Sequence, residues 1–123
     1  MPDVARGELW WASLDPIVGS EQGGRRPVLV LQNDAVSSFT TTVMAIPLTT
    51  NLRRSQLPSA VFVPSVGTGL PSDSVALCHQ ARVLDKSRLH GRIGMLPDDL
   101  LHQVEYAVLF TLGILQPTKG ISG

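Results

Sequence analysis

The sequence predicts a mostly β fold that ends in one long helix. Apolar and β-branched runs of strand length, separated by prolines and glycines, recur from residue 8 to residue 84. After Leu96 the apolar residues change to helical spacing. The chain has 123 residues and 43% hydrophobic content, which is the size of one domain that can bury a core. We therefore expect a single domain over residues 1–123.

About five strands are expected. The aromatic-rich segment Glu8–Ser13 predicts the first, because Asp15-Pro16 stops it. The run from Pro27 to Gln32 is apolar up to Leu31, which predicts a central strand buried on both faces, with Pro27 at its first position. The remaining predicted strands cover residues 40–46, which end at Pro47, residues 60–63, and residues 74–84, the longest.

The C-terminal part of the chain predicts a helix that Pro97 opens and Gly113 stops. Asp98 and Asp99 suit the positive end of the helix dipole. The apolar positions with helical spacing are Leu100, Leu101, Val104, Val108, Leu112 and Leu115. Residues 117–123 are small and polar, so we expect a flexible tail.

Charge and cysteine content limit the classes of protein. The net charge is zero, but residues 53–92 carry six basic groups against two acidic ones. This excess predicts either a basic surface or charges scattered over a solvated one. The single cysteine, Cys78, excludes an intrachain disulfide framework and cysteine-based zinc spacings. No stretch has the pattern of a signal peptide or a membrane span, so a soluble protein of the reducing cytoplasm is expected.

Several catalytic patterns are missing. The glycine pair before Arg25 lacks the Lys-Ser/Thr of a phosphate loop, and no Gly-x-Ser-x-Gly is present. His79, His90 and His102 lack paired ligand spacing, so we expect no metal site and no cofactor.

The stretch GSEQGGRRPVLV places two arginines between a flexible loop and an apolar strand. An arginine fork fits two phosphate oxygens, and Pro27 stiffens the backbone beside Arg26. The pair therefore indicates a phosphate site. The alternative is a surface ion pair with Glu21 or Asp34.

The same residues resemble a known family. The segments RGELW, LDP, GSEQGGRRPVLV, QND and LDKSRL, at positions 6–10, 14–16, 19–30, 32–34 and 84–89, are similar in kind and order to the MazF/PemK family of toxins, over residues 5–115. The resemblance implies a compact SH3-like antiparallel β-barrel (CcdB/Kid/MazF-like) with a C-terminal helix. It also implies a homodimer that cleaves single-stranded mRNA at specific sequences without a metal, as the toxin of a type II toxin-antitoxin system. A small MazE-like antitoxin would neutralise it, and DNA would be contacted only through that antitoxin.

The resemblance also assigns residues. The family's catalytic arginine precedes the proline, which makes it Arg26, and its catalytic threonine follows MAIPL, which makes it Thr49. The RNA groove would be bordered by residues of the loop and of the predicted strand 74–84: Ser20, Glu21, Gln22, Gly23, Gly24, Arg25 and Gln80. Arg53 and Arg54 would contact flanking phosphates or cover the site.

Metal-free RNA cleavage can use the 2′-hydroxyl as nucleophile, giving a 2′,3′-cyclic phosphate and a 5′-hydroxyl. Arg26 suits stabilisation of the extra negative charge, but a guanidinium stays protonated at pH 7 and is a poor base. Thr49 suits orienting or relaying a proton. Histidine titrates nearest neutrality, so His79, where relatives often carry a carboxylate, either transfers a proton or shapes the groove.

Two points stay open in the sequence. Trp10 and Trp11 pack in the core or at a dimer contact, or stack on bases. A gyrase-poisoning toxin of the same fold and an SH3-like peptide-binding module are the alternative functions, although an aromatic content of 5% is low for a peptide groove. The recognised RNA sequence and the antitoxin are not encoded in any visible pattern.

Overall fold

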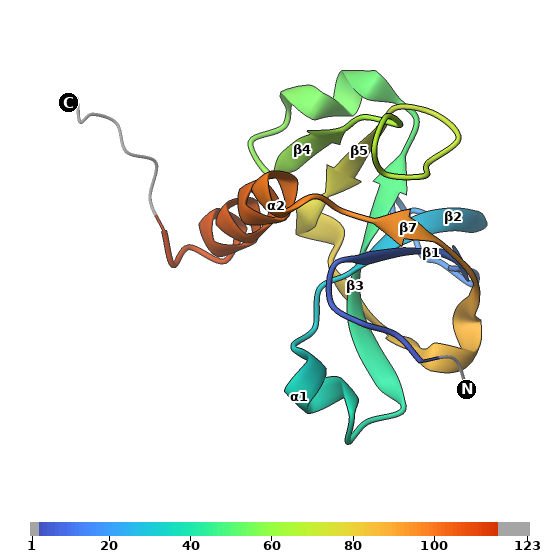
Figure 1. Ribbon diagram of the computed structural model, residues 1–123. Coiled ribbons are helices and arrows are strands. Elements are labelled where there is room, and N and C mark those ends of the chain that lie inside the picture. Colours follow the sequence, from blue (N-terminus) through green and yellow to red (C-terminus); the bar gives the residue numbers. More distant parts are fainter. Residues whose placement is uncertain (1–2, 116–123) are drawn as a thin grey trace.

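The computed structural model describes residues 3–115. The strands are β1 (Glu8–Ser13), β2 (Arg25–Val30), β3 (Thr42–Thr49), β4 (Ala60–Val63), β5 (Ser74–Leu77), β6 (Arg82–Asp85) and β7 (Leu89–Met95). The helices are α1 (Asp34–Ser37) and α2 (Asp98–Thr111), and the 3-10 turns are η1 (Leu52–Gln56), η2 (Cys78–Gln80) and η3 (Lys86–Arg88). The predicted mostly β fold with a C-terminal helix is confirmed (Figure 1).

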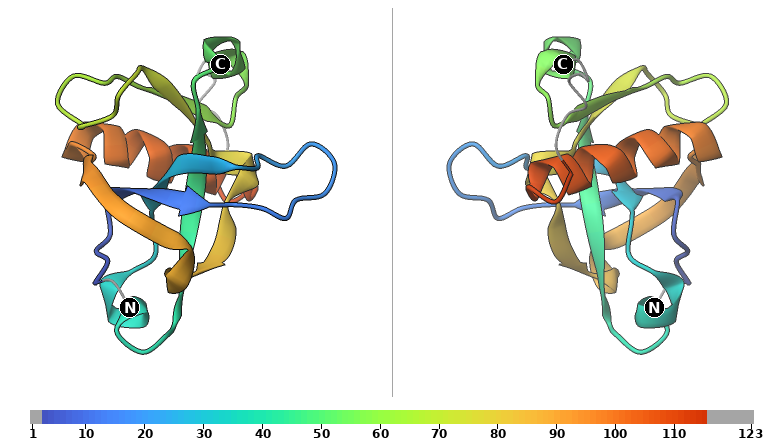
Figure 2. Two further views of the ribbon diagram at one scale, coloured as in Figure 1. Left: turned by 90° about the vertical axis from the view of Figure 1, so that its right-hand side faces the viewer. Right: turned by 90° about the vertical axis from the view of Figure 1, so that its left-hand side faces the viewer.

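The strands pair antiparallel in the order β4-β5-β3-β2-β1-β7, and β6 pairs with β3 outside this path. β3 therefore connects three neighbours, with β2 on one side and β5 and β6 on the other. The loop between β1 and β2, residues 14–24, projects from the body of the molecule, as the blue loop in Figure 2 shows.

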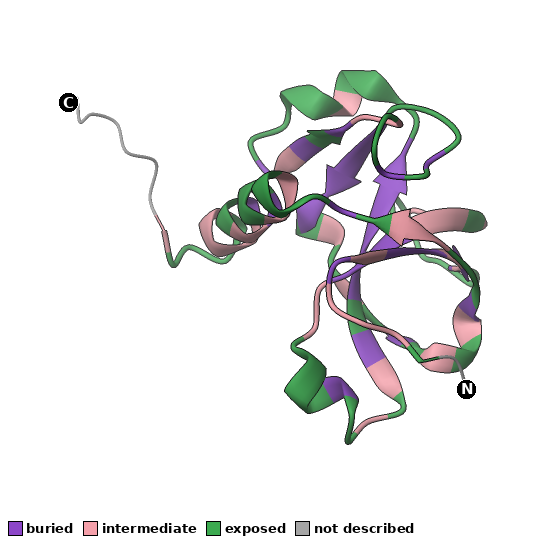
Figure 3. Ribbon diagram, viewed as in Figure 1, coloured by how far each residue is buried: buried purple, intermediate pink, exposed green. Residues whose placement is uncertain are grey.

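Side chains on the two faces of the sheet form two hydrophobic clusters. Leu29 packs in the cluster that also holds Val104 and Ala107 of α2, whereas Val28 and Val30 pack in the other. The prediction that this strand is buried on both faces is confirmed for Val28, Leu29 and Val30. Figure 3 shows the buried residues, in purple, concentrated in strands such as β3 and β5. Trp10 lies in the second cluster, which agrees with the core alternative.

The predicted single strand 74–84 is wrong. Ala45 of β3 pairs with Arg82, whereas Leu48 pairs with Ala76, so three steps along β3 correspond to six along its partner. The turn η2 takes up the three extra residues and separates β5 from β6. His79 and Gln80 consequently lie on a turn rather than inside a strand.

Both proline boundaries were also wrong. β3 continues through Pro47, which lies between Ala45, the last residue paired with β6, and Leu48, the first paired with β5. Pro27 is the third residue of β2, two places after Arg25, and the pairing with β3 begins only after it. Proline has no backbone N–H and cannot donate a hydrogen bond to a neighbouring strand. It is tolerated in a sheet where the strand is unpaired on one side, as beside each of these two prolines.

The helix α2 follows Pro97, which caps it rather than opening its first turn. Gly113 has φ +79°, so the predicted stop is confirmed. Leu112 and Leu115 lie beyond the helix, and the predicted tail 117–123 falls outside the described residues. The sequence did not predict β7, α1 or the 3-10 turns, and the expectation of about five strands is too low, since the described chain has seven. Neither α1 nor α2 is long and apolar enough to span a membrane.

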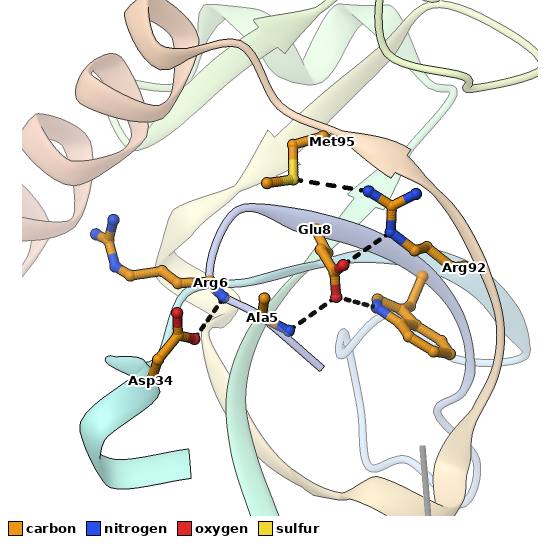
Figure 4. A network of polar contacts seen from close by, with 7 residues as sticks. Ala5, Arg6, Glu8, Asp34, Arg92 and Met95 are labelled. Carbon is orange, nitrogen blue, oxygen red and sulfur yellow. Dashed lines mark hydrogen bonds and ion pairs between the residues drawn. The ribbon is translucent and has the colours of Figure 1, made fainter. Parts of the chain in front are cut away.

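A polar network fastens the start of the chain to β1 and β7 (Figure 4). The Glu8 carboxylate accepts hydrogen bonds from the Ala5 amide at 2.8 Å, from Trp10 Nε1 at 3.1 Å and from Arg92 Nε at 2.8 Å. Burial by itself would raise the pKa of Glu8, but these hydrogen bonds and the Arg92 charge outweigh it and hold the pKa below its ordinary value. Nearby, Arg6 forms an ion pair with Glu105 of α2.

Candidate active site

A pocket of about 360 Å³ lies where β2 begins and β3 ends. We call it the strand-end pocket. It is lined by Trp11, Gly23, Gly24, Arg25, Arg26, Pro27, Leu48, Thr49, Thr50, Pro71 and Ser74. Val28 pairs with Pro47, and continuing this register by two residues places Arg26 opposite Thr49. The two residues predicted to be catalytic therefore line one pocket.

The guanidinium of Arg26 is oriented by its own loop. Its Nε donates to the Gly23 carbonyl at 2.7 Å, and its terminal nitrogens bind no other residue in the described chain. The plane of the fork is thus fixed, while the two groups that can bind an anion bidentately stay available.

Thr49 is the most enclosed polar residue of the pocket after Ser74, with 7% of its surface exposed. Its Oγ accepts a hydrogen bond from the Asn51 amide at 3.2 Å. Because that bond occupies an oxygen lone pair, the hydroxyl proton can be donated to a group in the pocket. Thr50, the next residue, is exposed.

The two glycines before the arginines have separate structural reasons. A Cβ at Gly23 would lie 2.7 Å from Asp15 Oδ1 and 2.9 Å from Ile17 Cδ1. Gly24 has φ +74° and donates its amide to Asp15 Oδ1 at 2.9 Å. The glycine pair therefore lets the loop fold tightly enough for the Gly23 carbonyl to meet Arg26.

A second pocket, of about 430 Å³, is lined by other residues of the same loop. We call it the loop groove. It is lined by Glu21, Gln22, Pro47, His79, Gln80, Ala81, Arg82 and Val83. Gln22 and Pro47 line the loop groove, whereas their chain neighbours Gly23 and Leu48 line the strand-end pocket. The two pockets are therefore adjacent.

His79 belongs to the loop groove and not to the strand-end pocket. Its ring is exposed, and Nδ1 forms a hydrogen bond of 2.9 Å with Oγ of the buried Ser59. Ser59 therefore orients the ring, and Nε2 has no hydrogen-bond partner in the described chain. His79 is separated from the lining that contains Arg26 and Thr49.

Comparison with known proteins identifies the family. Residues 5–112 match the family model described as PemK-like, MazF-like toxin of type II toxin-antitoxin system. The chain belongs to the MazF-like toxin family. It is 39% identical over 112 residues to the endoribonuclease EndoA of Bacillus subtilis, which covers 91% of this chain and 97% of that protein.

Solved MazF structures share the fold. MazF from Deinococcus radiodurans superposes with a TM-score of 0.77 at 34% identity, covering 91% of this chain and 96% of that one. A MazE-MazF complex from the same organism matches with a TM-score of 0.71 at 34% identity, covering 93% and 97%. The predicted MazF-like fold is thereby confirmed.

The ion-pair alternative for the arginines of this MazF-like chain is wrong. The Arg25 guanidinium lies 4.4 Å from the ring centroid of Trp11, and Arg26 binds the Gly23 carbonyl. Glu21 instead accepts a bond from the Val18 amide. In the described part of the chain neither arginine is paired with a carboxylate. Arg25 thus stacks at the pocket wall, while Arg26 has the more constrained position.

Most of the basic excess in residues 53–92 fastens the MazF-like fold to itself. Arg82 donates to the Leu14 carbonyl at 3.2 Å, and Arg88 donates to the carbonyls of Ser13 and Asp15 at 3.1 and 2.6 Å. Lys86 binds the Ser37 carbonyl, and Arg92 binds Glu8. The sequence did not reveal these roles, because each joins segments far apart in the chain.

Arg53 and Arg54 lie on η1, which begins three residues after Thr49. Neither lines the strand-end pocket or the loop groove, so their phosphate contacts stay a prediction. Ser20 is exposed at the projecting loop.

In the described chain, the single cysteine and the possible metal ligands contribute no further reactive group. Burial raises the pKa of the Cys78 thiol to about 12, so this cysteine is an inert core residue. Within residues 3–115, no three histidine, cysteine, aspartate or glutamate side chains are grouped to hold a metal ion.

Proposed function

We propose that this MazF-like endoribonuclease cleaves single-stranded mRNA at specific sequences, with the strand-end pocket as its catalytic centre. The observation that carries the proposal is the pairing of a pre-oriented Arg26 with the enclosed Thr49 hydroxyl in one pocket. This is a donor set suited to a phosphodiester.

The reaction needs no external nucleophile. The 2′-hydroxyl gives up its proton to water or through the Thr49 hydroxyl as its oxygen bonds to the adjacent phosphorus. The bond from phosphorus to the 5′-oxygen breaks and that oxygen takes up a proton, so the products end in a 2′,3′-cyclic phosphate and a 5′-hydroxyl. The terminal nitrogens of Arg26 stabilise the added charge on the phosphorane, and Thr49 donates to a phosphate oxygen or relays a proton. Metal ions are not required, because the substrate supplies its nucleophile.

Single-stranded substrate follows from the geometry of the reaction. In-line attack and base reading both need an unstacked, splayed backbone. The loop groove adjoins the strand-end pocket and offers Glu21, Gln22 and His79 to a neighbouring nucleotide. Recognition of the bases next to the scissile phosphate is assigned to this groove.

The direct test is cleavage of a long single-stranded RNA in EDTA, followed by analysis of the product ends. The proposal expects a limited set of fragments with 2′,3′-cyclic phosphate and 5′-hydroxyl ends, and cleavage at least about 100-fold slower with Arg26→Ala. An RNA left intact at high enzyme concentration would favour a gyrase poison. Fragments with 5′-phosphates would contradict the 2′-hydroxyl mechanism.

We further propose that the chain forms a homodimer and is inhibited by an acidic MazE-like antitoxin that competes with RNA. The MazE-MazF complexes of the Deinococcus radiodurans relative support an antitoxin partner. A disordered acidic segment that folds on binding can follow a long groove. Sedimentation at micromolar concentration checks the dimer, and an antitoxin that leaves RNA binding unchanged would contradict competition.

A further inference from the structure

Gln80 reaches across from η2 to the loop between β1 and β2. Its Oε1 accepts a hydrogen bond from the Gln22 amide at 2.8 Å, and its Nε2 donates to the Ser20 carbonyl at 3.4 Å. Both ends of the Gln80 amide are therefore directed at loop backbone, with the Gln22 contact the shorter and more buried of the two.

The backbone of Gln22 and Gly23 connects the Gln80 contact to Arg26. Gln80 fixes the amide of Gln22, and the next residue, Gly23, supplies the carbonyl that accepts from Arg26 Nε at 2.7 Å. A shift of the Gln22 peptide would move the Gly23 carbonyl and, with it, the plane of the guanidinium.

The loop has many attachments at its foot and few beyond it. Arg82 and Arg88 hold the backbone of residues 13–15, and Asp15 binds the Gly24 amide. Within the described chain, Gln80 is the only residue outside the loop that hydrogen-bonds to residues 16–22. In the described chain, Gln80 thus supplies both hydrogen bonds that join the outer loop to residues outside the loop.

The turn that carries Gln80 is itself well anchored. Cys78, two residues earlier, is buried in the core cluster that includes residues of α2, and its amide donates to the Ser59 carbonyl at 3.0 Å. A side chain on such a turn can impose a position on a projecting loop.

We propose that Gln80 is a positioning residue: its hydrogen bonds, which we call the latch, hold the loop in place so that the Gly23 carbonyl orients Arg26 for catalysis. This inference rests on the proposed function of the strand-end pocket. It differs from the RNA-reading role that the family resemblance implies for Gln80, because both polar ends of its side chain are engaged with the loop.

The test compares Gln80→Ala, Gln80→Glu and the matched control Gln103→Ala, which changes an exposed glutamine on α2. Single-turnover cleavage gives the saturating rate and the half-saturating RNA concentration, and NMR gives the exchange rate of the Gln22 amide. Gln80→Ala is expected to lower the saturating rate by about 10- to 100-fold with little change in half-saturation, since small misplacements at a reacting centre cost this much.

Gln80→Glu keeps the acceptor for the Gln22 amide but adds a negative charge. It should retain a saturating rate within about threefold of wild type and need more RNA for half-saturation, because the charge repels phosphate. The Gln22 amide should exchange about tenfold faster in Gln80→Ala than in wild type or Gln80→Glu, as expected for loss of one hydrogen bond.

Two results would overturn the latch. One is a Gln80→Ala variant with a wild-type saturating rate and altered half-saturation alone, which would make Gln80 an RNA contact. The other is an unchanged Gln22 exchange rate. If the wild-type protein cleaved no RNA, the proposed function would fail, whereas the exchange measurement would still decide whether the latch exists.

Discussion

The strand-end pocket and the loop groove adjoin each other but are built differently. The strand-end pocket takes Arg26 and Thr49 from two central strands, β2 and β3, and the register of these strands, continued two residues past the Val28–Pro47 pair, brings the two residues opposite each other. The loop groove takes Glu21 and Gln22 from the projecting loop and His79 and Gln80 from η2, and residues of β3 and β6 complete its lining. The loop and η2 are joined by side-chain contacts such as the one between Gln22 and Gln80. Under the proposed function, this difference places the residues for bond breaking on the sheet, while the proposed recognition residues Glu21, Gln22 and His79 lie on a loop and a turn, which can vary with less effect on the sheet.

The largest effect is expected from Arg26. Arg26→Ala should lower the cleavage rate by at least about 10²- to 10³-fold, because one positioned charge donor contributes about 2.7 to 4 kcal/mol to the transition state. Arg25→Ala is the matched control and should only weaken cleavage, since Arg25 stacks on Trp11. Rate measurements on both variants check this, and equal losses would mean that the pair acts as a nonspecific phosphate clamp.

The second largest loss of cleavage rate is expected from Thr49. Thr49→Val keeps the shape of the side chain but removes the hydroxyl, so the cleavage rate should fall severely, by about 10²-fold, with little change in the unfolding midpoint. Thr50→Val changes an exposed neighbour and should be mild. A larger loss from Thr50→Val would shift the catalytic assignment by one residue.

A His79 variant tests whether a residue of the loop groove acts in RNA binding or in catalysis. Because it lines the loop groove, His79→Ala should weaken RNA binding by about 2- to 10-fold or alter sequence preference, which corresponds to one hydrogen bond. A single-turnover pH series should give parallel profiles for wild type and variant, with the exposed His102→Ala as control. A pH-dependent limb present in wild type and missing only in His79→Ala would instead make His79 a proton shuttle.

The smallest effect on cleavage is expected from the Glu8 network, which contributes no residue to either pocket. Glu8→Gln should lower the free energy of unfolding at pH 7 by about 1 to 3 kcal/mol, because bonds to the carboxylate are lost or weakened. RNA cleavage well below the unfolding temperature should be unchanged.

The sign of its pH dependence follows from the lowered pKa of Glu8. The stabilisation is present above the carboxyl's unfolded pKa, about 4.3, and is lost as pH falls through the lower folded value. Urea unfolding should therefore show the gap between wild type and Glu8→Gln closing in acid. A gap that widened there, or one matched by the exposed Asp99→Asn, would contradict this role.

Features that depend on local sequence pattern are predicted from the sequence, whereas features that depend on strand pairing are missed. Strand β1, the buried strand β2, the helix stop at Gly113 and the loop-strand position of Arg26 depend on local pattern, and the structure has them close to where they are predicted. The step between β5 and β6 is set by the register against β3, so no local pattern marks it.

The same holds for the contacts around the site. The bond from Ser59 to His79 and the bond from Gln80 to Gln22 join residues 20 and 58 positions apart. Pro71 and Ser74 line the strand-end pocket only because β5 pairs with β3. The family resemblance proposes the catalytic residues, whereas the contacts that position them depend on the folded topology.

The most direct measurement is a paired comparison of Arg26→Ala and His79→Ala on one RNA that carries the cleavage sequence. Affinity is measured with a noncleavable version that has a 2′-deoxy group at the scissile nucleotide, and the saturating single-turnover rate with the ordinary RNA. We expect Arg26→Ala to lose mainly rate and His79→Ala to lose mainly affinity or sequence preference. Loss of rate in both with affinity retained, or the reverse assignment, would contradict the division between a catalytic strand-end pocket and a recognising loop groove.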